Sequence, residues 1–534
     1  MLVSPAVPNR MWKLVALTLA AACCIVLGEE CPCNISGNKL ICTGIKLDAS
    51  PPESCFAGKS IKQLVISRLQ EGGFKTLQLP SSQYCASLEK IIVTDVAKLW
   101  EVEGLSHCPQ IRQVIVKSCA LKQLPSVTGL ANLKDVVLRN NEISEIPADA
   151  FATNPSLEEV NLSYNKISEV PETIFANNPK LDEVDLSYNK ITTLPSGLFS
   201  HNPKLEELEL THNGLTSLPS DIFKNNRKLE KIDISSNKLK SLPERVFDGL
   251  VELEDLYISG NELESLPPHL LDPLVKLEDL LLQDNLLTEL PPTLLSSLTH
   301  LEKLNVSNNK LERLPEGLCA SNRRLEKLDV SGNYLTEIPS DLLSSASRLE
   351  KLALCHNKLT TLPSGLLSSA TRLKYLWAES NKISSLPADF FRNTAKLETL
   401  DLSENHLTDL PEGILSPLTK LRSLLLANNE LTSLKPVWWQ GNSLRKLSYL
   451  DVSGNKIHTL PEDYELEKVL VDLDKLGLNN NPWKCDCSLK PVLDKLAAKG
   501  RLQPSVLLAP SLCAEPSEVK GKALTDWRTI ADCH

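Results

Sequence analysis

Four cysteines close together, Cys31, Cys33, Cys42 and Cys55, are the first residues whose types and spacing indicate chemistry. Such a cluster can form two disulfides, or it can hold a zinc ion through its thiolates. The segment before it has the features of an export signal, and the oxidising environment of an exported protein favours disulfides. We therefore interpret these cysteines as disulfide-bonded and expect no metal site.

Motifs of known catalytic sites are absent from the sequence. It contains no Gly-x-Ser-x-Gly, no His-Glu-x-x-His and no glycine-rich phosphate-binding loop. The nine histidines are scattered along the chain. The sequence therefore predicts a protein without enzymatic activity and without a cofactor. The net charge of −10 also argues against a nucleic-acid partner, because nucleic-acid-binding domains carry basic surfaces.

Two aromatic residues one position apart, Tyr375 and Trp377, indicate a binding surface instead. Aromatic residues make up only 4% of the chain, so this pair stands out. Alternate residues of a β-strand point to the same face, so both rings would lie on one surface. Exposed Trp and Tyr are typical of the residues that dominate protein interfaces. The alternative is ordinary aromatic use on a half-exposed sheet, and the sequence does not decide between the two.

The first residues predict export from the cell. The apolar run 14–27 follows Arg10 and Lys13 and is shorter than the about 20 apolar residues of a membrane span. Residues 1–28 are therefore interpreted as a secretory signal peptide. With no second apolar run and no hydrophobic tail for a lipid anchor, we expect a secreted protein without membrane insertion. Because exported proteins can be N-glycosylated, the three sequons at Asn34, Asn161 and Asn305 are predicted glycosylation sites.

A repeat of 24 residues positions the aromatic pair and two of the three sequons. Regular copies run from Leu133 to Leu421 and follow the pattern Leu-x-x-Leu-x-Leu-x-x-Asn-x-Leu. The alternation predicts a strand with inward leucines, and stacked copies predict a parallel sheet in which each copy contacts its neighbours. Asn at the ninth position of fifteen copies is expected to be buried and to bind neighbouring backbone. Looser copies begin at Ile61, Leu88, Ile111, Leu447 and Leu473.

This pattern resembles the extracellular leucine-rich repeat family, in its 24-residue type with Leu-Pro and Phe positions, over nearly all of residues 61–481. The resemblance implies an α/β solenoid, a right-handed horseshoe of about 18 coils. Its concave side would be a parallel β-sheet, and its convex side mostly turns, 3₁₀ helix and short irregular segments. The expected organisation is a signal peptide over 1–28, an N-terminal cysteine cap over 29–60, repeats over 61–480 and a C-terminal cysteine cap over 481–534.

The cysteine clusters resemble the terminal caps of this family. For the C-terminal cap, the family's pairing implies the disulfides Cys485–Cys513 and Cys487–Cys533. In the N-terminal cap, Cys31 and Cys33 are closer together than is usual in the family, so the pairing there stays open.

Five further cysteines lie within the repeats. Cys85 and Cys108 each precede a copy by three residues, so they share one position on adjacent coils and are predicted to form a disulfide. Cys119 and Cys319 fall at inward positions and are predicted to be buried, unreactive thiols. Cys355, at the seventh position of its copy, is expected near the concave rim. It is either an unpaired thiol without consequence or the site of an intermolecular disulfide.

The outward positions of the strands divide the concave face into an acidic and an apolar part. Acidic coils are usually a solubilising surface; as a site they would bind a basic ligand with salt-sensitive kinetics. The apolar part is the stronger candidate for binding. The predicted binding residues are Tyr375, Trp377, Ala353, Leu425, Tyr257 and Leu281, together with the acidic Glu183, Asp185, Glu207 and Glu209.

The sequence therefore predicts a secreted, non-catalytic binding protein of the extracellular space or matrix. Its partner would be an extracellular or cell-surface protein, and its role recognition, adhesion or ligand capture. The alternative is a regulatory subunit that stabilises a secreted enzyme, as in the family member that carries a circulating carboxypeptidase. The sequence leaves open whether the chain forms a homo-oligomer.

Overall fold

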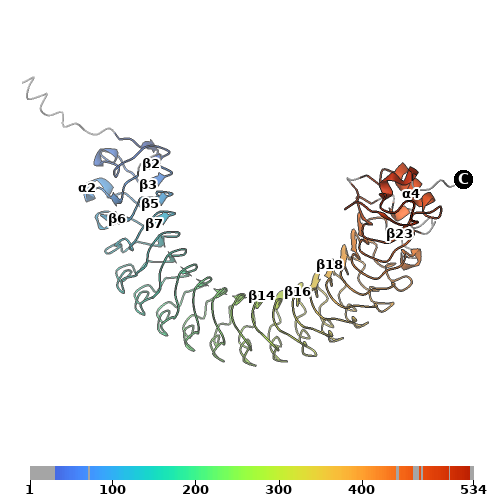
Figure 1. Ribbon diagram of the computed structural model, residues 1–534. Coiled ribbons are helices and arrows are strands. Elements are labelled where there is room, and N and C mark those ends of the chain that lie inside the picture. Colours follow the sequence, from blue (N-terminus) through green and yellow to red (C-terminus); the bar gives the residue numbers. More distant parts are fainter. Residues whose placement is uncertain are drawn as a thin grey trace, which may run out of the picture. The chain divides into compact units, whose positions relative to one another are not determined.

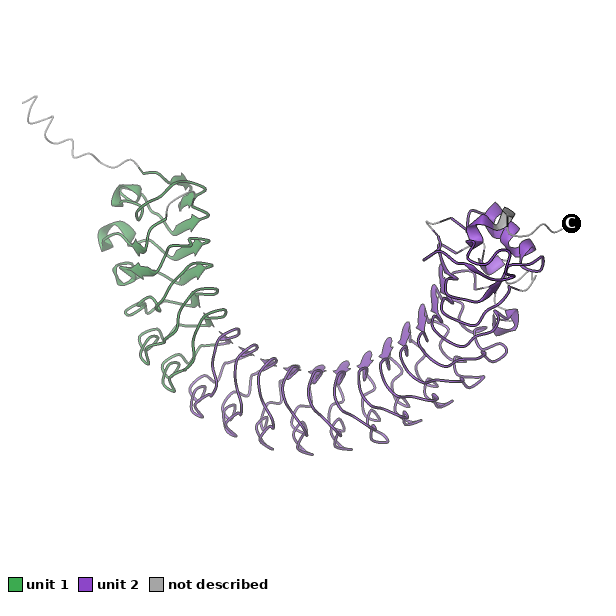
Figure 2. Cartoon of the chain, in the orientation of Figure 1, with its two compact units in different colours: residues 1–181 green, residues 182–534 purple. Residues whose placement is uncertain are grey.

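A computed structural model describes residues 31–69, 73–439, 444–460, 468–470, 473–503 and 506–529. The chain divides into two compact units, Met1–Leu181 and Asp182–His534, coloured green and purple in Figure 2. The predicted signal peptide and Cys533 lie outside the described residues.

The first unit is built on a sheet that begins with an antiparallel pair and continues in parallel. Strand β1 (Asn34–Ser36) pairs antiparallel with β2 (Lys39–Thr43) and covers the edge that β2 would otherwise present to solvent. From β2 the order is parallel and follows the sequence (Figure 1). The successive strands are β3 (Gln63–Ser67), β5 (Lys90–Thr94), β7 (Gln113–Lys117), β8 (Asp135–Val137) and β9 (Glu159–Asn161).

On its other side, the first unit carries a second, smaller sheet. Strands β4 (Thr76–Gln78) and β6 (Glu101–Glu103) pair in parallel there. They alternate with the 3₁₀ helix η1 (Glu53–Cys55), the helix α2 (Ser82–Cys85) and the 3₁₀ helix η2 (Leu105–His107). The repeat pattern did not predict this sheet, because the copies of this region are irregular between their strands.

The second unit has one parallel strand of three residues per repeat. Each residue lies opposite the residue at the same repeat position of the next strand. Within the purple unit of Figure 2, the strands line the inner side of the curve and the turns its outer side. The strands are β10 (Glu183–Asp185), β11 (Glu207–Glu209), β12 (Lys231–Asp233), β13 (Asp255–Tyr257), β14 (Asp279–Leu281), β15 (Lys303–Asn305), β16 (Lys327–Asp329), β17 (Lys351–Ala353), β18 (Tyr375–Trp377), β19 (Thr399–Asp401), β20 (Ser423–Leu425), β21 (Tyr449–Asp451) and β22 (Lys475–Gly477). The prediction of a repeat solenoid is confirmed.

The core consists of the inward leucines and a spine of aromatic and aliphatic side chains under the turns. Within the first unit the rings of Phe151 and Phe175 stack at 6.2 Å, and within the second unit those of Phe223 and Phe247 stack at 6.4 Å. The 3₁₀ helix η3 (Pro436–Trp439) buries both Trp438 and Trp439. The indole N–H of Trp438 donates to Asp409 at 3.0 Å, which satisfies its polar atom inside the protein.

The ninth-position asparagines join neighbouring coils through their side-chain amides. In the copy that begins at Leu301, the Nδ2 of Asn309 donates to the carbonyl oxygens of Val306 (3.1 Å) and Ser307 (3.1 Å) of its own turn, and of Leu282 (3.0 Å) one coil back. Its Oδ1 accepts from the backbone N–H of Leu287 at 3.0 Å. One buried amide thus satisfies backbone groups of two coils, which fixes the register between them.

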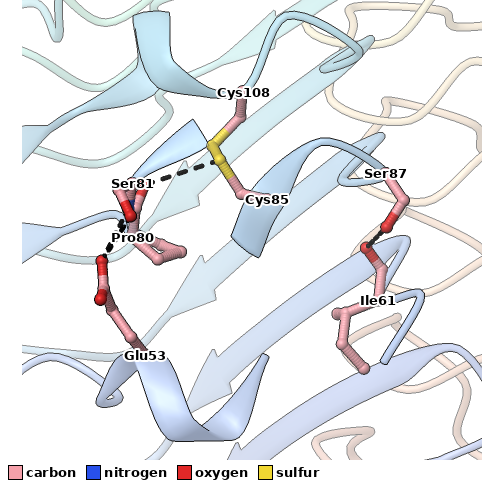
Figure 3. The surroundings of a disulfide bond; sticks show 7 residues. All are labelled: Glu53, Ile61, Pro80, Ser81, Cys85, Ser87 and Cys108. Carbon is pink, nitrogen blue, oxygen red and sulfur yellow. Dashed lines mark hydrogen bonds between the residues drawn. A yellow bond between two sulfur atoms is a disulfide. The ribbon is translucent and has the colours of Figure 1, made fainter. Parts of the chain in front are cut away.

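Disulfides stabilise both ends of the described chain. At the N-terminal end the pairs are Cys31–Cys55 and Cys33–Cys42, which settles the pairing that the sequence left open. Cys85 and Cys108 are joined, with their Cα atoms 5.3 Å apart, as Figure 3 shows. The same figure shows the Glu53 carboxylate accepting hydrogen bonds from the backbone N–H (2.9 Å) and hydroxyl (2.8 Å) of Ser81.

The C-terminal end of the second unit is closed by a short helix and a small parallel pair. Cys485 is joined to Cys513, and Cys487 is also disulfide-bonded. Helix α4 (Lys490–Ala498) ends before Gly500, whose φ of 70° is left-handed. The other elements are β23 (Trp483–Lys484), β24 (Cys513–Glu515) and the 3₁₀ helix η4 (Leu524–Thr529). Among the described residues, no helix combines the length and apolar character needed to cross a membrane.

We expect Asn309→Ala to lower the free energy of unfolding by roughly 2 kcal/mol, because it leaves the buried backbone N–H of Leu287 without its partner and removes one of the two amide bonds to the Leu282 carbonyl. Urea unfolding monitored by circular dichroism measures the loss. Lys310→Ala, an exposed change on the same coil, is the matched control. Equal unfolding midpoints for the two variants would contradict the role assigned to the ninth-position amide.

Candidate binding face

The aromatic pair singled out in the sequence lies on β18 and is half-exposed. The rings of Tyr375 and Trp377 stack with their centroids 5.5 Å apart and their planes 8° from parallel. The Nζ of Lys351, on the neighbouring strand β17, lies 5.4 Å from the centroid of the Tyr375 ring. A cation at this distance is attracted by the ring face. The three side chains form one ordered stack on the strand side of the second unit.

The residues beside Trp377 determine how far the apolar surface extends. Its cross-strand partners are Ala353 on β17 and Asp401 on β19. Ala353 is buried, with only 9% of its surface exposed, so its contribution to a binding surface is small. Leu425 pairs with Asp401 and is therefore separated from Trp377 by an acidic residue. The apolar group predicted from the sequence is brought together only in part.

Tyr257 and Leu281 form a second, separate pair. They lie opposite each other on β13 and β14, which are five and four strands away from β18 in the sheet. Burial, together with the carboxylates of Asp255 and Asp279, raises the pKa of Tyr257 well above its ordinary value. The Tyr257 hydroxyl also hydrogen-bonds to Asp255, so it is engaged within its own strand.

The predicted acidic residues have different roles. Glu207 is exposed and lies opposite Glu183, while Lys231 on the next strand pairs with Glu209 at 2.6 Å and lies 3.9 Å from Glu207. This lysine offsets part of the negative charge of the patch. Asp185 was expected to face a ligand, but it is buried and its Oδ1 accepts hydrogen bonds from Ser187. It stabilises the end of its strand.

The contact between Asp185 and Ser187 is one example of a recurrent pair that the sequence analysis did not identify. An Asp or Asn at the fifth position accepts a hydrogen bond of 2.9 Å from the backbone N–H of a Ser at the seventh position. In the second unit this pair occurs at Asp185–Ser187, Asp233–Ser235, Asn305–Ser307, Asp329–Ser331, Asp401–Ser403 and Asp451–Ser453. A signal was in the sequence, because every Asp or Asn at the fifth position of the second unit is followed by Ser at the seventh, whereas Ala353 is followed by Cys355 and Trp377 by Glu379. Coils without the pair are free to carry other side chains.

A column of glutamates at the second repeat position was also not predicted. It runs through seven consecutive copies, Glu206, Glu230, Glu254, Glu278, Glu302, Glu326 and Glu350. Burial raises the pKa of Glu278, and the neighbouring carboxylates of Glu302 and Glu254 raise it further. Burial and Glu206 act on the pKa of Glu230 in the same direction. In-register stacking therefore places like charges beside one another.

Among the described residues, the free cysteines are Cys119, Cys319 and Cys355. Cys319 is fully buried, and burial raises the pKa of its thiol to about 12, as expected for an unreactive core thiol. Cys119 was expected to be buried but is only half-buried; it follows β7 in one of the less regular copies, and burial raises the pKa of its thiol to about 11. Cys355 is half-buried at the rim of the sheet, and burial followed by the charge of Glu379 raises its pKa to about 12.

The three sequons lie in strands. Asn34 is exposed in β1, whereas Asn161 and Asn305 are half-buried and accept hydrogen bonds from the backbone N–H groups of Ser163 and Ser307. Glycosylation at these positions stays a prediction.

The similarity of this chain to known proteins lies in its repeats. The leucine-rich repeat family model matches more than half of the chain, at residues 109–167, 131–189, 155–215, 203–263, 275–335, 323–383 and 379–431. Human chondroadherin is 28% identical over 111 residues, which are 19% of this chain. The match spans 28% of the length of chondroadherin.

Solved structures show the same kind of fold. The leucine-rich repeat protein LIC12759 of Leptospira interrogans is 30% identical, with a TM-score of 0.62, and the match covers 71% of this chain and 92% of that protein. The Toll–Spatzle complex of Drosophila is similar with a TM-score of 0.70 and 22% identity, over 92% of this chain and 71% of that chain. The likeness to Toll concerns the fold alone.

We expect Glu278→Gln to raise the melting temperature at pH 7 and low salt by a small amount, on the order of 1 °C. Because the pKa of Glu278 is raised in the folded state, its ionised form disfavours folding above that pKa. The penalty disappears as the pH falls below the ordinary value of 4.5, so the difference should vanish near pH 4. Differential scanning calorimetry at both pH values checks this, with the exposed Glu312→Gln as control. An equal gain at both pH values would rule out repulsion within the column.

Proposed function

Because this chain belongs to the leucine-rich repeat family, we propose that it is an extracellular, non-catalytic protein that binds another protein through the strand side of its second unit. The proposal rests on the family, on the disulfides and on the aromatic stack of β18. The disulfides support an oxidising compartment, since such bonds persist outside the cell and are rare in the cytosol. The export signal predicted for residues 1–28 fits the same location.

The observation that carries the proposal is the stack of Lys351, Tyr375 and Trp377. Both rings are half-exposed, the two rings stack on each other, and the Lys351 ammonium lies over the Tyr375 ring. An ordered aromatic side chain loses little conformational freedom when a partner covers it, so more of the contact energy is available for binding. Tyr, Trp and cationic side chains together are characteristic of binding hot spots.

The related proteins support a protein ligand rather than a small molecule. Toll, which shares the fold, is found in complex with the protein Spatzle. Recognition by repeat proteins of one architecture depends on the side chains of the variable positions, so this likeness supports the class of ligand and leaves its identity to experiment. The acidic residues around Glu207 provide a second contact zone for a basic region of the partner.

We expect Tyr375→Ala/Trp377→Ala to weaken partner binding by more than about tenfold without lowering the melting temperature, because the rings lie outside the core. The test is affinity capture from native extracellular fluid and matrix extract, followed by surface plasmon resonance with the captured protein. Tyr164→Ala/Tyr334→Ala is the matched control, since it removes two exposed aromatic rings at positions that are not among the predicted binding residues.

The outcomes separate the roles. A partner lost by the β18 variant and retained by the control supports the proposal. A partner retained equally by both variants would place binding elsewhere and contradict it. If the captured partner is a single secreted enzyme whose activity co-purifies in fixed stoichiometry, the chain is an enzyme-stabilising subunit instead.

A further inference from the structure

Three potential metal ligands meet at the ends of two neighbouring strands of the second unit. Cys355 and His356 follow β17, and Glu379 follows β18. One ligand atom from each of the three residues lies within 4.8 Å of the others. The thiol and the carboxylate are half-buried, and the imidazole is exposed. These residues belong to none of the predicted binding positions.

Backbone geometry holds the three residues in place. His356 has a left-handed φ of 53°, as do most residues at the eighth position of the repeat, and its N–H donates to the carbonyl oxygen of Glu379 at 3.0 Å. This bond ties the two coils together at the cluster. His212 occupies the same repeat position six copies earlier, but it stacks on Tyr188 at 4.1 Å and the next coil offers serine there. The cluster thus depends on the particular side chains of two coils.

The cluster occupies the place where other coils carry the Asp–Ser pair. On the coils to either side, the seventh position is Ser331 and Ser403, each bonded to its own aspartate. In the two coils between them, the aspartate is replaced by Ala353 or Trp377. Cys355 and Glu379 therefore do not have the strand-end role that serine has elsewhere.

One carboxylate oxygen of Glu379 has no hydrogen-bond partner although it is buried. The Oε2 atom is inaccessible to solvent, while the rest of the carboxylate interacts with the Cys355 thiol. A buried acceptor without a partner is costly. A cation beside this oxygen would provide the missing interaction, and it would also bring the sulfur and the imidazole nitrogen into use.

We propose that Cys355, His356 and Glu379 form a binding site for a zinc-class divalent ion. Thiolate, imidazole and carboxylate are the ligands that Zn²⁺ prefers, with bonds of about 2.0–2.3 Å. Tetrahedral ligands at such distances lie roughly 3.5 Å apart, so the ligand atoms, now within 4.8 Å of one another, would move closer together when the ion binds. The thiol releases its proton to solvent when the sulfur binds the ion. Three protein ligands leave a fourth position for water or for a side chain of another protein.

The test uses Co²⁺ as a spectroscopic probe on the full chain, with its disulfides intact and its free thiols kept reduced under anaerobic conditions. We expect one equivalent of Co²⁺ to bind, with a thiolate-to-cobalt charge-transfer band, and Zn²⁺ to displace it. Zn²⁺ should also raise the melting temperature in a concentration-dependent way, because it binds the folded state. Cys355→Ser should abolish the band, and His356→Asn and Glu379→Gln should each weaken binding by at least about tenfold.

The variants and controls are matched to the repeat. Ser and Asn are the residues that other coils carry at the seventh and eighth positions, so Cys355→Ser and His356→Asn are compatible with the fold. Cys119→Asn removes a different free thiol and restores the ninth-position consensus, and His212→Asn removes the equivalent histidine of another coil. Both controls should bind Co²⁺ as the unaltered chain does.

Three results would overturn the site. The first is the lack of a charge-transfer band in the unaltered chain. The second is a band that persists in Cys355→Ser. The third is a covalent dimer through Cys355 that, once reduced, shows no affinity for either ion; this would make the cysteine an intermolecular disulfide site.

Discussion

The in-register stacking of coils is the constraint on which the rest of the structure depends. A single coil exposes most of its apolar side chains, so each copy is stable only when its neighbours cover them. Parallel pairing of identical positions, such as Leu376 of β18 with Leu352 and Leu400, lets the same side chain fill the same space in every copy. The ninth-position amides then lock this register, because each one satisfies backbone groups of two coils. A shift of one residue would leave these groups unpaired in a buried environment.

The same register that stabilises the core is unfavourable for charges. A residue type repeated at one outward position becomes a column, with neighbouring members separated by about the strand spacing of 4.8 Å. For leucine this is favourable, but for glutamate it produces repulsion, which adds to the effect of burial in raising the pKa of Glu278. A basic residue relieves part of this repulsion at one end of the column, where Lys374 takes the second position and pairs with Glu350 at 2.8 Å. The exposed location of these charges keeps the cost small.

The repeat made the fold predictable, but it did not predict the side-chain contacts at the ends of the strands. The spacing of leucine and asparagine predicted the parallel strands and the buried amides, because these features follow from periodicity alone. The fifth position was interpreted as an outward binding position, but Asp185 is buried and accepts a hydrogen bond from Ser187, a local interaction that the spacing of the leucines does not reveal. The small sheet of β4 and β6 escaped prediction for a related reason, since the first copies are irregular between their strands. Leu425 was grouped with Trp377 by chemical type, although Asp401 lies between them.

The departures from the repeat are where specific recognition has room to arise. At six strand ends of the second unit the Asp–Ser or Asn–Ser pair engages polar atoms of the fifth and seventh positions, and these coils present the same local structure. The coils that begin at Leu349 and Leu373 lack the pair, and they carry the aromatic stack and the Cys355–His356–Glu379 cluster instead. Their ninth-position asparagines are unchanged and their inward side chains stay apolar and buried, with Ala378 in place of the usual larger residue, so the register of the core is preserved. Stability and recognition therefore depend on different positions of the same 24 residues, and side chains on the sheet surface can differ from coil to coil while the register that supports them stays the same.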